Sequence, residues 1–273
     1  MSALETPWAP LGVGSIVGQS VSVFFRRIVL FVLLAFVPIL ATSLLLASVV
    51  GLDFEAALAE RMVGPQPGDA STGFLWLIGA FIAIGNALFV VVLAVMVQAA
   101  YDTRLRRGIR TAAYLGGALR RIVPLLLCSL VVVVLFYAAA VLLLIPGLWV
   151  LAVFSVVIPV VVIEGRGFAS LGRSAALTKG YRWPIVGALI LLSICAILLS
   201  LVLGLVTGVL GIAAASIGSG GGGWWGTLFG TVWQSLSTAA TFGIPCIGVS
   251  LIYARLREIK EGASVESLAE VFA

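Results

Sequence analysis

The stretch "IEGRGFASLGRSAALTKGYRWP", residues 163–184, holds four of the chain's sixteen Lys and Arg residues and separates two long runs of Val, Leu, Ile and Ala. Of the 273 residues, 62% are hydrophobic and only 10% are charged. A soluble domain carries roughly 25% charged residues, so a soluble fold could not cover its surface with so few. The apolar runs are unbroken and of helix length, which indicates membrane-spanning helices and argues against a barrel of short alternating strands.

We predict six spans, because about 20 residues are needed to cross the hydrocarbon core. Kinks are expected at Pro38 in the first span and at Gly243 and Pro245 in the last. The connection between the third and fourth spans is reduced to Pro146 and Gly147. The predicted spans are about 28–50, 74–100, 122–145, 148–163, 184–206 and 227–253.

The connections between these spans alternate in charge. The loop between the first two spans carries Asp53, Glu55, Glu60 and Asp69, whereas all basic residues except Arg61 fall on the opposite side. Positively charged connections stay in the cytoplasm. The sequence therefore predicts a multi-pass protein of the bacterial inner (plasma) membrane with both termini in the cytoplasm.

The chain also repeats itself. A short basic or polar segment that looks helical precedes each outgoing span: "GSIVGQSVSVFFRRIVL" (14–30), "RTAAYLGGALRRIVPLL" (110–126) and "RGFASLGRSAALTKGYRWPIV" (166–186). Stacked units of this kind predict repeats at about 12–107, 108–165 and 166–260, followed by an amphipathic tail at 261–273. The expected fold is an all-α integral membrane protein with six transmembrane helices as three hairpins, each preceded by a short cytoplasmic interfacial helix.

That architecture explains the interruption at residues 163–184. Residues 166–179 are predicted to form a helix lying at the cytoplasmic interface. Lys179 and Gly180 suit its C-terminal end, since glycine tolerates a left-handed cap and a cation suits the helix dipole.

The composition removes much catalytic chemistry. The chain has no histidine, which excludes Ser-His-Asp triads and HExxH zinc sites. Cys128, Cys195 and Cys246 lie in separate apolar runs without CxxC spacing and are interpreted as small buried hydrophobes. We expect no catalytic residues, no metal site and no cofactor, and therefore no enzyme.

A cluster of charges is expected where the basic connections meet the spans. One interpretation is a charged gate or a headgroup site. The other is a set of helix-end ion pairs that fix one repeat against the next, each worth about 0–1 kcal/mol when exposed. The candidate residues are Asp102, Arg104, Glu164, Arg173 and Arg255.

Three larger polar residues fall within the spans: Asn86, Gln98 and Gln234. Such residues line a pathway in transporters or form hydrogen bonds between helices. Gly204 and Gly208 make a GxxxG pattern that favours close helix packing, within the chain or with a partner.

The basic residues are spread over every span end, as topology requires. They are expected to contact anionic lipid headgroups at the cytoplasmic face and not nucleic acid. A membrane-protein partner or a second copy of the chain would be a further partner.

One long segment resembles a known family. "IPGLWVLAVFSVVIPVVVIEGRGFASLGRSAALTKGYRW" (145–183) is similar to the membrane-domain family of glycerophosphodiester phosphodiesterases, which includes stand-alone, uncharacterised six-helix proteins of the bacterial inner membrane. A second matching part runs from Tyr253 to Gly262, although Ala254 stands where the family often has Asp. The matching positions are Pro146, Gly147, Pro159, Glu164, Gly165, Arg173, Ser174, Gly180, Tyr253, Arg255, Leu256, Arg257, Glu261 and Gly262.

The resemblance implies a fold and a topology but no activity. Some relatives are fused to a catalytic barrel, whose chemistry relies on histidines. We expect no such barrel in these 273 residues, which contain no histidine. We expect a non-enzymatic protein with a structural or accessory role, in lipid organisation or as the scaffold of a membrane complex. The alternative is a transporter or channel for a small or lipidic substrate.

Cysteine labelling tests the orientation, in a background without Cys128, Cys195 and Cys246. A cysteine at Gln66 is expected to react with an impermeant maleimide on intact cells, because it lies in the acidic loop. A cysteine at Ser264 is expected to react only after the membrane is permeabilised. The reverse pattern would invert the topology, and labelling of both from outside would exclude an even number of spans.

Overall fold

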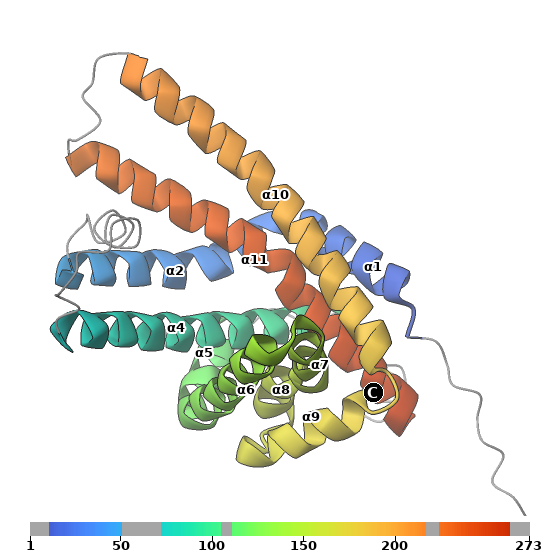
Figure 1. Ribbon diagram of the computed structural model, residues 1–273. Helices are drawn as coiled ribbons and strands as arrows, with labels where there is room; N and C mark the ends of the chain where they lie inside the picture. The colour runs from blue at the N-terminus through green and yellow to red at the C-terminus, as the bar shows by residue number, and fades with distance from the viewer. Residues whose placement is uncertain (1–10, 51–71, 105–110, 217–223, 263–273) are drawn as a thin grey trace, which may run out of the picture.

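A computed structural model describes residues 11–50, 72–104, 111–216 and 224–262 (Figure 1). All elements in these residues are helical. They are α1 (Val13–Arg26), α2 (Ile28–Val50), α4 (Thr72–Arg104), α5 (Thr111–Arg120), α6 (Ile122–Leu142), α7 (Leu144–Phe154), α8 (Val157–Pro159), the π-helical turn η1 (Val160–Glu164), the 3-10 turn η2 (Gly167–Ala169), α9 (Ser170–Thr178), α10 (Arg182–Ser216) and α11 (Trp224–Glu261).

Several of these helices are long and apolar enough to cross a membrane. In the described residues there are five such segments: Gly85–Thr103, Ile122–Val141, Ile145–Glu164, Arg182–Val209 and Leu228–Glu261. A sixth results if α1 and the described part of α2 count as one broken span, although they meet at 82°. The part of the chain that the structure describes is therefore all-helical, with helices of the length and hydropathy found in multi-pass membrane proteins.

Helix α11 organises the packing. It lies against α2, α10, α4 and α1, and Figure 1 shows it between α2 and α10. Its residues Ile247 and Tyr253 are fully buried, as are Phe31 of α2 and Met96 of α4. The core thus gathers around the half of α11 that ends in basic residues.

Two glycines of α11 allow this close packing. A Cβ on Gly243 would lie 2.2 Å from Cε2 of Phe24 in α1, and one on Gly248 would lie 2.2 Å from Cδ1 of Leu192 in α10. The sequence predicted a kink at Gly243 and Pro245, and another at Pro38. The helices α2 and α11 continue through Pro38 and Pro245. Gly243 leaves room for the Phe24 ring of the neighbouring helix α1.

The turn between the third and fourth spans lies earlier than predicted. Leu143 is extended (φ −162°, ψ 147°) and separates α6 from α7, so Pro146 and Gly147 belong to the first turns of α7. Proline is tolerated there because the first N–H groups of a helix have no partner within it. Gly147 eases the close approach of the two helices, because an added Cβ would lie only 3.1 Å from Cβ of Ala140 and 3.2 Å from its Cα.

The fourth span is also not one continuous helix. It begins at Leu144 and not at 148, and it is divided into α7, α8 and η1. By contrast, α10 and α11 extend beyond the predicted spans, to Ser216 and Glu261. Ion pairs one turn apart, Arg255 with Glu258 and Arg257 with Glu261, continue α11 past its apolar part.

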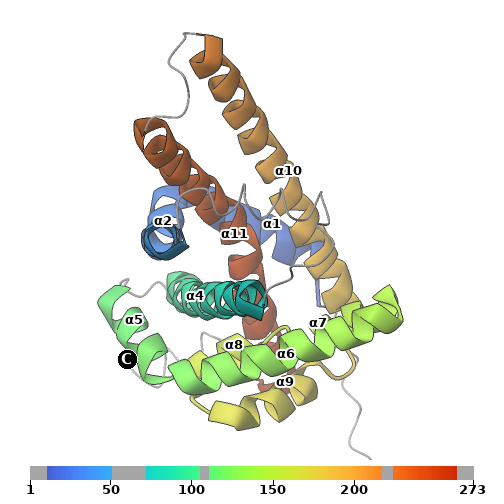
Figure 2. The same ribbon diagram turned by 60° about the vertical axis from the view of Figure 1, so that its left-hand side comes forward.

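The three hairpins do not share one direction. Figure 1 shows α2 and α4 side by side, and the view in Figure 2 shows α6 crossing the direction of α4. Helix α6 packs mainly against α7, and most of its surface is exposed and apolar. The helix pairs α2–α4, α6–α7 and α10–α11 are in contact in the described residues, but they do not lie parallel to one another.

Short helices precede α2, α6 and α10, at the positions predicted from the repeats. Helix α1 buries Ile16, Ser20 and Phe24, which are four residues apart and share one face. Helix α5 buries Tyr114 and Ala118, which also lie four residues apart, and leaves Leu115 and Leu119 exposed.

The end of α9 confirms the predicted stop at Lys179 and Gly180. Gly180 has a φ of 89°, in the left-handed region that glycine tolerates.

Other predictions fall outside the described residues. They concern the acidic loop with Gln66, the arginines at 106, 107 and 110, the glycine-rich connection at 217–223, and the tail with Ser264.

The contact at Gly243 can be tested against an open glycine. Gly243→Ala is expected to lower the free energy of unfolding by about 1–3 kcal/mol, because its methyl group enters the space of the buried Phe24 ring. Gly204→Ala is the matched control, since no atom lies within 4 Å of its added Cβ. Thermal unfolding in detergent should separate the two, and equal melting temperatures would contradict the packing role.

Candidate functional site

The polar and charged residues that meet where η1, α9 and the C-terminal part of α11 come together form the candidate site. Its centre is the Glu164 cluster, defined as Glu164, Arg166, Arg173, Tyr253 and Glu261. These residues come from η1, the turn after it, α9 and α11, so the cluster joins the end of the fourth span to the last helix.

The local fold at the end of the fourth span places Glu164. It is the last residue of η1, and Gly165 ends the turn with a φ of 72°. Helix ends leave backbone carbonyls without partners. Here the Arg121 guanidinium donates from Nη1 to the carbonyls of Val161 and Val162. Gly165 lets Arg121 approach, because an added Cβ would lie 3.0 Å from its Nη2.

The Glu164 carboxylate has three side-chain partners. Its Oε2 lies 2.9 Å from Nε of Arg166 and 3.1 Å from Nε of Arg173. The Tyr253 hydroxyl donates to Oε1 over 3.0 Å. The Glu164 side chain is only 10% exposed, so these charge-assisted hydrogen bonds replace most of its hydration.

A second carboxylate extends the network along α11. Glu261 pairs with Arg173 through Nη2, and with Nε of Arg257 at 2.9 Å. The Arg257 guanidinium also lies 5.9 Å from the centre of the Tyr253 ring. Close by, Lys260 donates from Nζ to the backbone carbonyl of Lys179 over 2.9 Å. The end of α11 is thus tied to the middle of α9 and to its C-terminal end.

The five residues of the predicted charge cluster do not form one site. Glu164 and Arg173 pair as described. Asp102 instead accepts a hydrogen bond from the Tyr114 hydroxyl at 2.6 Å, which ties α4 to α5. Arg255 pairs with Glu258 at 3.1 Å, and the side chain of Arg104 lies outside the described part of the chain.

The predicted intramembrane polar residues are also separate. Asn86 donates from Nδ2 to the Ser129 hydroxyl over 3.3 Å, between α4 and α6. Gln98 donates from Nε2 to the carbonyls of Ala94 and Tyr114, at 3.3 and 3.4 Å. Gln234 is exposed on α11. The first two therefore act as hydrogen-bond links, and the three do not converge on a cavity in the described residues.

Sequence reasoning missed a second set of links. The Ser174 and Thr178 hydroxyls of α9 both donate to the carbonyl of Val153, at 2.8 and 3.2 Å. These two bonds give the Val153 carbonyl hydrogen-bond partners at the end of α7, where the helix is interrupted. The signal was available, because Ser170, Ser174 and Thr178 are spaced by four and share one helix face.

The described residues offer no metal site and little nucleophilic chemistry. No three His, Cys, Asp or Glu side chains within them are grouped so that they could hold a metal ion. Cys128 and Cys246 are buried, as predicted, and Cys195 is partly buried. The arrangement pairs arginine side chains with carboxylates and thereby holds helices together.

Comparison of the chain with protein-family models, with curated proteins and with solved structures found no match.

The hydrogen bond between Tyr253 and Glu164 can be measured by a double-mutant cycle. Tyr253→Phe is expected to lower the free energy of unfolding by about 1–2 kcal/mol, because it removes a buried donor to a carboxylate. In a Glu164→Gln background the same change should cost clearly less.

Tyr137→Phe is the matched control for this cycle. Tyr137 is 64% exposed on α6, and its change should leave the melting temperature almost unaltered. Equal effects of the two tyrosine variants would contradict a specific role for Tyr253.

Proposed function

We propose that the chain is a non-enzymatic integral membrane protein with a structural or accessory role, organising lipid or holding a membrane complex. Its place is the bacterial inner membrane, with both termini in the cytoplasm. Its partners are membrane lipids and, in addition, a membrane protein or a second copy of the chain.

The observation that carries this proposal is how the polar groups are used. The Glu164 cluster, the Asn86–Ser129 bond and the Gln98 contacts all join one helix to another. A carboxylate that relays protons or binds a substrate must exchange partners, whereas Glu164 has two guanidinium partners and one hydroxyl partner. The chemistry of this region thus favours holding helices in place over turnover.

The surface supports contact with lipid. Helices α6 and α10 expose long apolar faces, with Val134 and Val141 on α6 and Leu201 and Leu205 on α10. Exposed basic residues, among them Arg26, Arg27 and Arg120, stand at helix ends. Each such charge near an anionic leaflet contributes about 1 kcal/mol to membrane attraction. Lipid headgroups explain this basic surface without nucleic acid.

Membership of the membrane-domain family of glycerophosphodiester phosphodiesterases is part of the proposal. It rests on the motifs at 145–183 and 253–262, and several of their charged positions lie in the Glu164 cluster. The absence of histidine from the chain keeps the phosphodiesterase activity out of the proposal.

One observation favours the alternative, a transporter or channel. The fourth span is interrupted by Ser155 and Val156 and ends in a π-helical turn beside Glu164. Broken helices at charged groups recur in transporters, where they bind ions or substrates. In this chain the hydroxyls of α9 bind the Val153 carbonyl at the interruption, and Arg121 binds carbonyls of the π-helical turn. Because these backbone groups already have protein partners, we rank this function second.

Native mass spectrometry of the gently extracted protein, together with alanine variants, tests the role. The wild type is expected to retain phospholipid or a stoichiometric protein partner. Asn86→Ala and Gln98→Ala should lower the melting temperature, because each removes a helix–helix hydrogen bond worth about 0.6 kcal/mol on average. Gln234→Ala should not lower it, since Gln234 is exposed.

Two outcomes would contradict the structural role. One is a wild type that keeps neither lipid nor partner. The other is unchanged stability of the variants Asn86→Ala and Gln98→Ala. Polar groups that line a transport pathway, and do not hold helices together, would behave in that way.

A further inference from the structure

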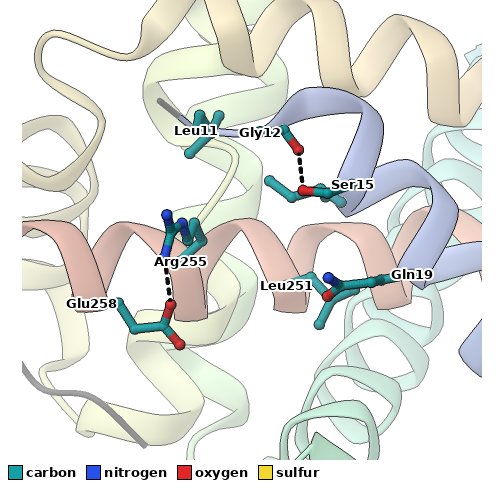
Figure 3. Close-up of a pocket in the computed structure, with 8 residues that line it drawn as sticks. Leu11, Gly12, Ser15, Gln19, Leu251, Arg255 and Glu258 are labelled. Atoms are coloured by element: carbon teal, nitrogen blue, oxygen red, sulfur yellow. Dashed lines mark hydrogen bonds and ion pairs between the residues drawn. The ribbon is translucent and has the colours of Figure 1, made fainter. Parts of the chain in front are cut away.

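A small polar pocket lies between α1 and α11, apart from the Glu164 cluster. Its volume is about 140 Å³. Figure 3 shows Ser15 and Gln19 projecting from α1, and Leu251, Arg255 and Glu258 projecting from α11. Leu11, Gly12 and Ile16 complete the lining.

Among its described lining residues, the pocket presents a cation and an anion side by side. Nη1 of Arg255 lies 3.1 Å from Oε2 of Glu258. This contact uses one nitrogen of a guanidinium that has five N–H donors, and the Arg255 side chain is 40% exposed. Arg255 therefore has further donors to offer to a ligand, next to a carboxylate that attracts a cation.

Neutral polar groups lie beside these charges. The Gln19 amide can donate and accept, and the Ser15 hydroxyl, which donates to the Gly12 carbonyl over 2.7 Å, can still accept. Buried Leu11, Ile16 and Leu251 form an apolar wall. The lining thus has donors for an anionic oxygen, acceptors for an N–H group and an apolar side.

The opposite charges of Arg255 and Glu258 indicate the class of ligand. Both residues line the pocket, so a simple anion would be attracted by one residue and repelled by the other. A zwitterion whose negative and positive groups are joined by a short spacer matches both. Phosphate suits the guanidinium, and a primary ammonium with three N–H donors suits Glu258, Gln19 and Ser15.

The size and place of the pocket fit a headgroup. Pockets for whole drug-sized ligands are about 300–1,000 Å³, so 140 Å³ admits only a small polar group. Helix α1 meets α2 at 82°, as a helix along the membrane surface would meet a span. A lipid headgroup could enter there while its acyl chains stay outside.

We propose that this pocket binds a phosphate–ammonium zwitterion, supplied by the headgroup of phosphatidylethanolamine. Arg255 binds the phosphate, and Glu258 accepts hydrogen bonds from the ammonium. The inference rests on the proposed function in lipid organisation and adds the site and the headgroup to it.

The test uses the full chain in nanodiscs of equal parts phosphatidylethanolamine, phosphatidylcholine and phosphatidylglycerol, followed by native mass spectrometry of the lipids that remain bound. Phosphatidylcholine has the same phosphate and the same net charge but no N–H donor. The wild type is expected to retain phosphatidylethanolamine about tenfold over phosphatidylcholine, the equivalent of about 1.4 kcal/mol.

Two variants separate the roles of the charges. Glu258→Gln should bring the ratio of phosphatidylethanolamine to phosphatidylcholine close to one, because the acceptor of the ammonium loses its charge. Arg255→Gln should lower retention of both. Arg26→Gln is the matched control, since it removes one exposed cation from the other end of α1 and should leave the ratio unchanged.

A third variant controls for the case in which the charge variants fail to fold. Ser15→Leu places an apolar side chain at an exposed position of α1, where it fills the pocket without removing a charge. It should abolish the preference while the melting temperature stays near that of the wild type. Free phosphoethanolamine, added as a competitor, distinguishes the source: displacement of the lipid at micromolar concentration would identify a soluble ligand of the same chemistry.

The outcomes distinguish this proposal from the proposed function. Retention of phospholipid with a ratio that none of the three pocket variants alters would overturn the pocket alone. Retention of no phospholipid by the wild type would overturn the lipid-organising role together with it.

Discussion

A carboxylate with little access to water must find its partners within the protein, and Glu164 finds them in the turn that follows it, on α9 and on α11. Arg166 lies just beyond it, Arg173 belongs to α9, and Tyr253 belongs to α11. An unpaired charge at such a place would cost several kcal/mol. The positions of η1, α9 and α11 are therefore coupled, because none can move far without leaving that charge exposed to apolar surroundings.

The sequence predicted the elements well where hydropathy alone decides them. Ile28 and Ile122 begin helices as expected, because each follows a pair of arginines and opens an unbroken apolar run. Prediction failed where backbone geometry decides. Pro146 and Gly147 are typical turn residues, yet the chain turns at Leu143, and the glycine serves the contact with Ala140. Hydropathy also cannot detect the break after Phe154, since the residues on both sides are equally apolar.

The candidate site was predicted in part for a similar reason. Charges at span ends were recognisable, and the pair Glu164–Arg173 was among them. Which charges meet depends on how the helices cross, and a single sequence does not encode crossing directions in a readable pattern. The glycines illustrate this: Gly204 and Gly208 carry the known packing motif and lie open, whereas Gly243 and Gly248 lack it and touch Phe24 and Leu192.

The capping of Val161 and Val162 by Arg121 has a consequence for the order in which the chain assembles. Donor and acceptors both lie within residues 121–162, so the middle hairpin can close as soon as the ribosome has released it. Glu164 lies just after this hairpin. Its hydrogen bond with Tyr253 and the neighbouring Arg173–Glu261 ion pair involve residues of α11, so both form only after α11 has been synthesised. Helix α11, synthesised after η1 and α9, is thus the element that holds the two together.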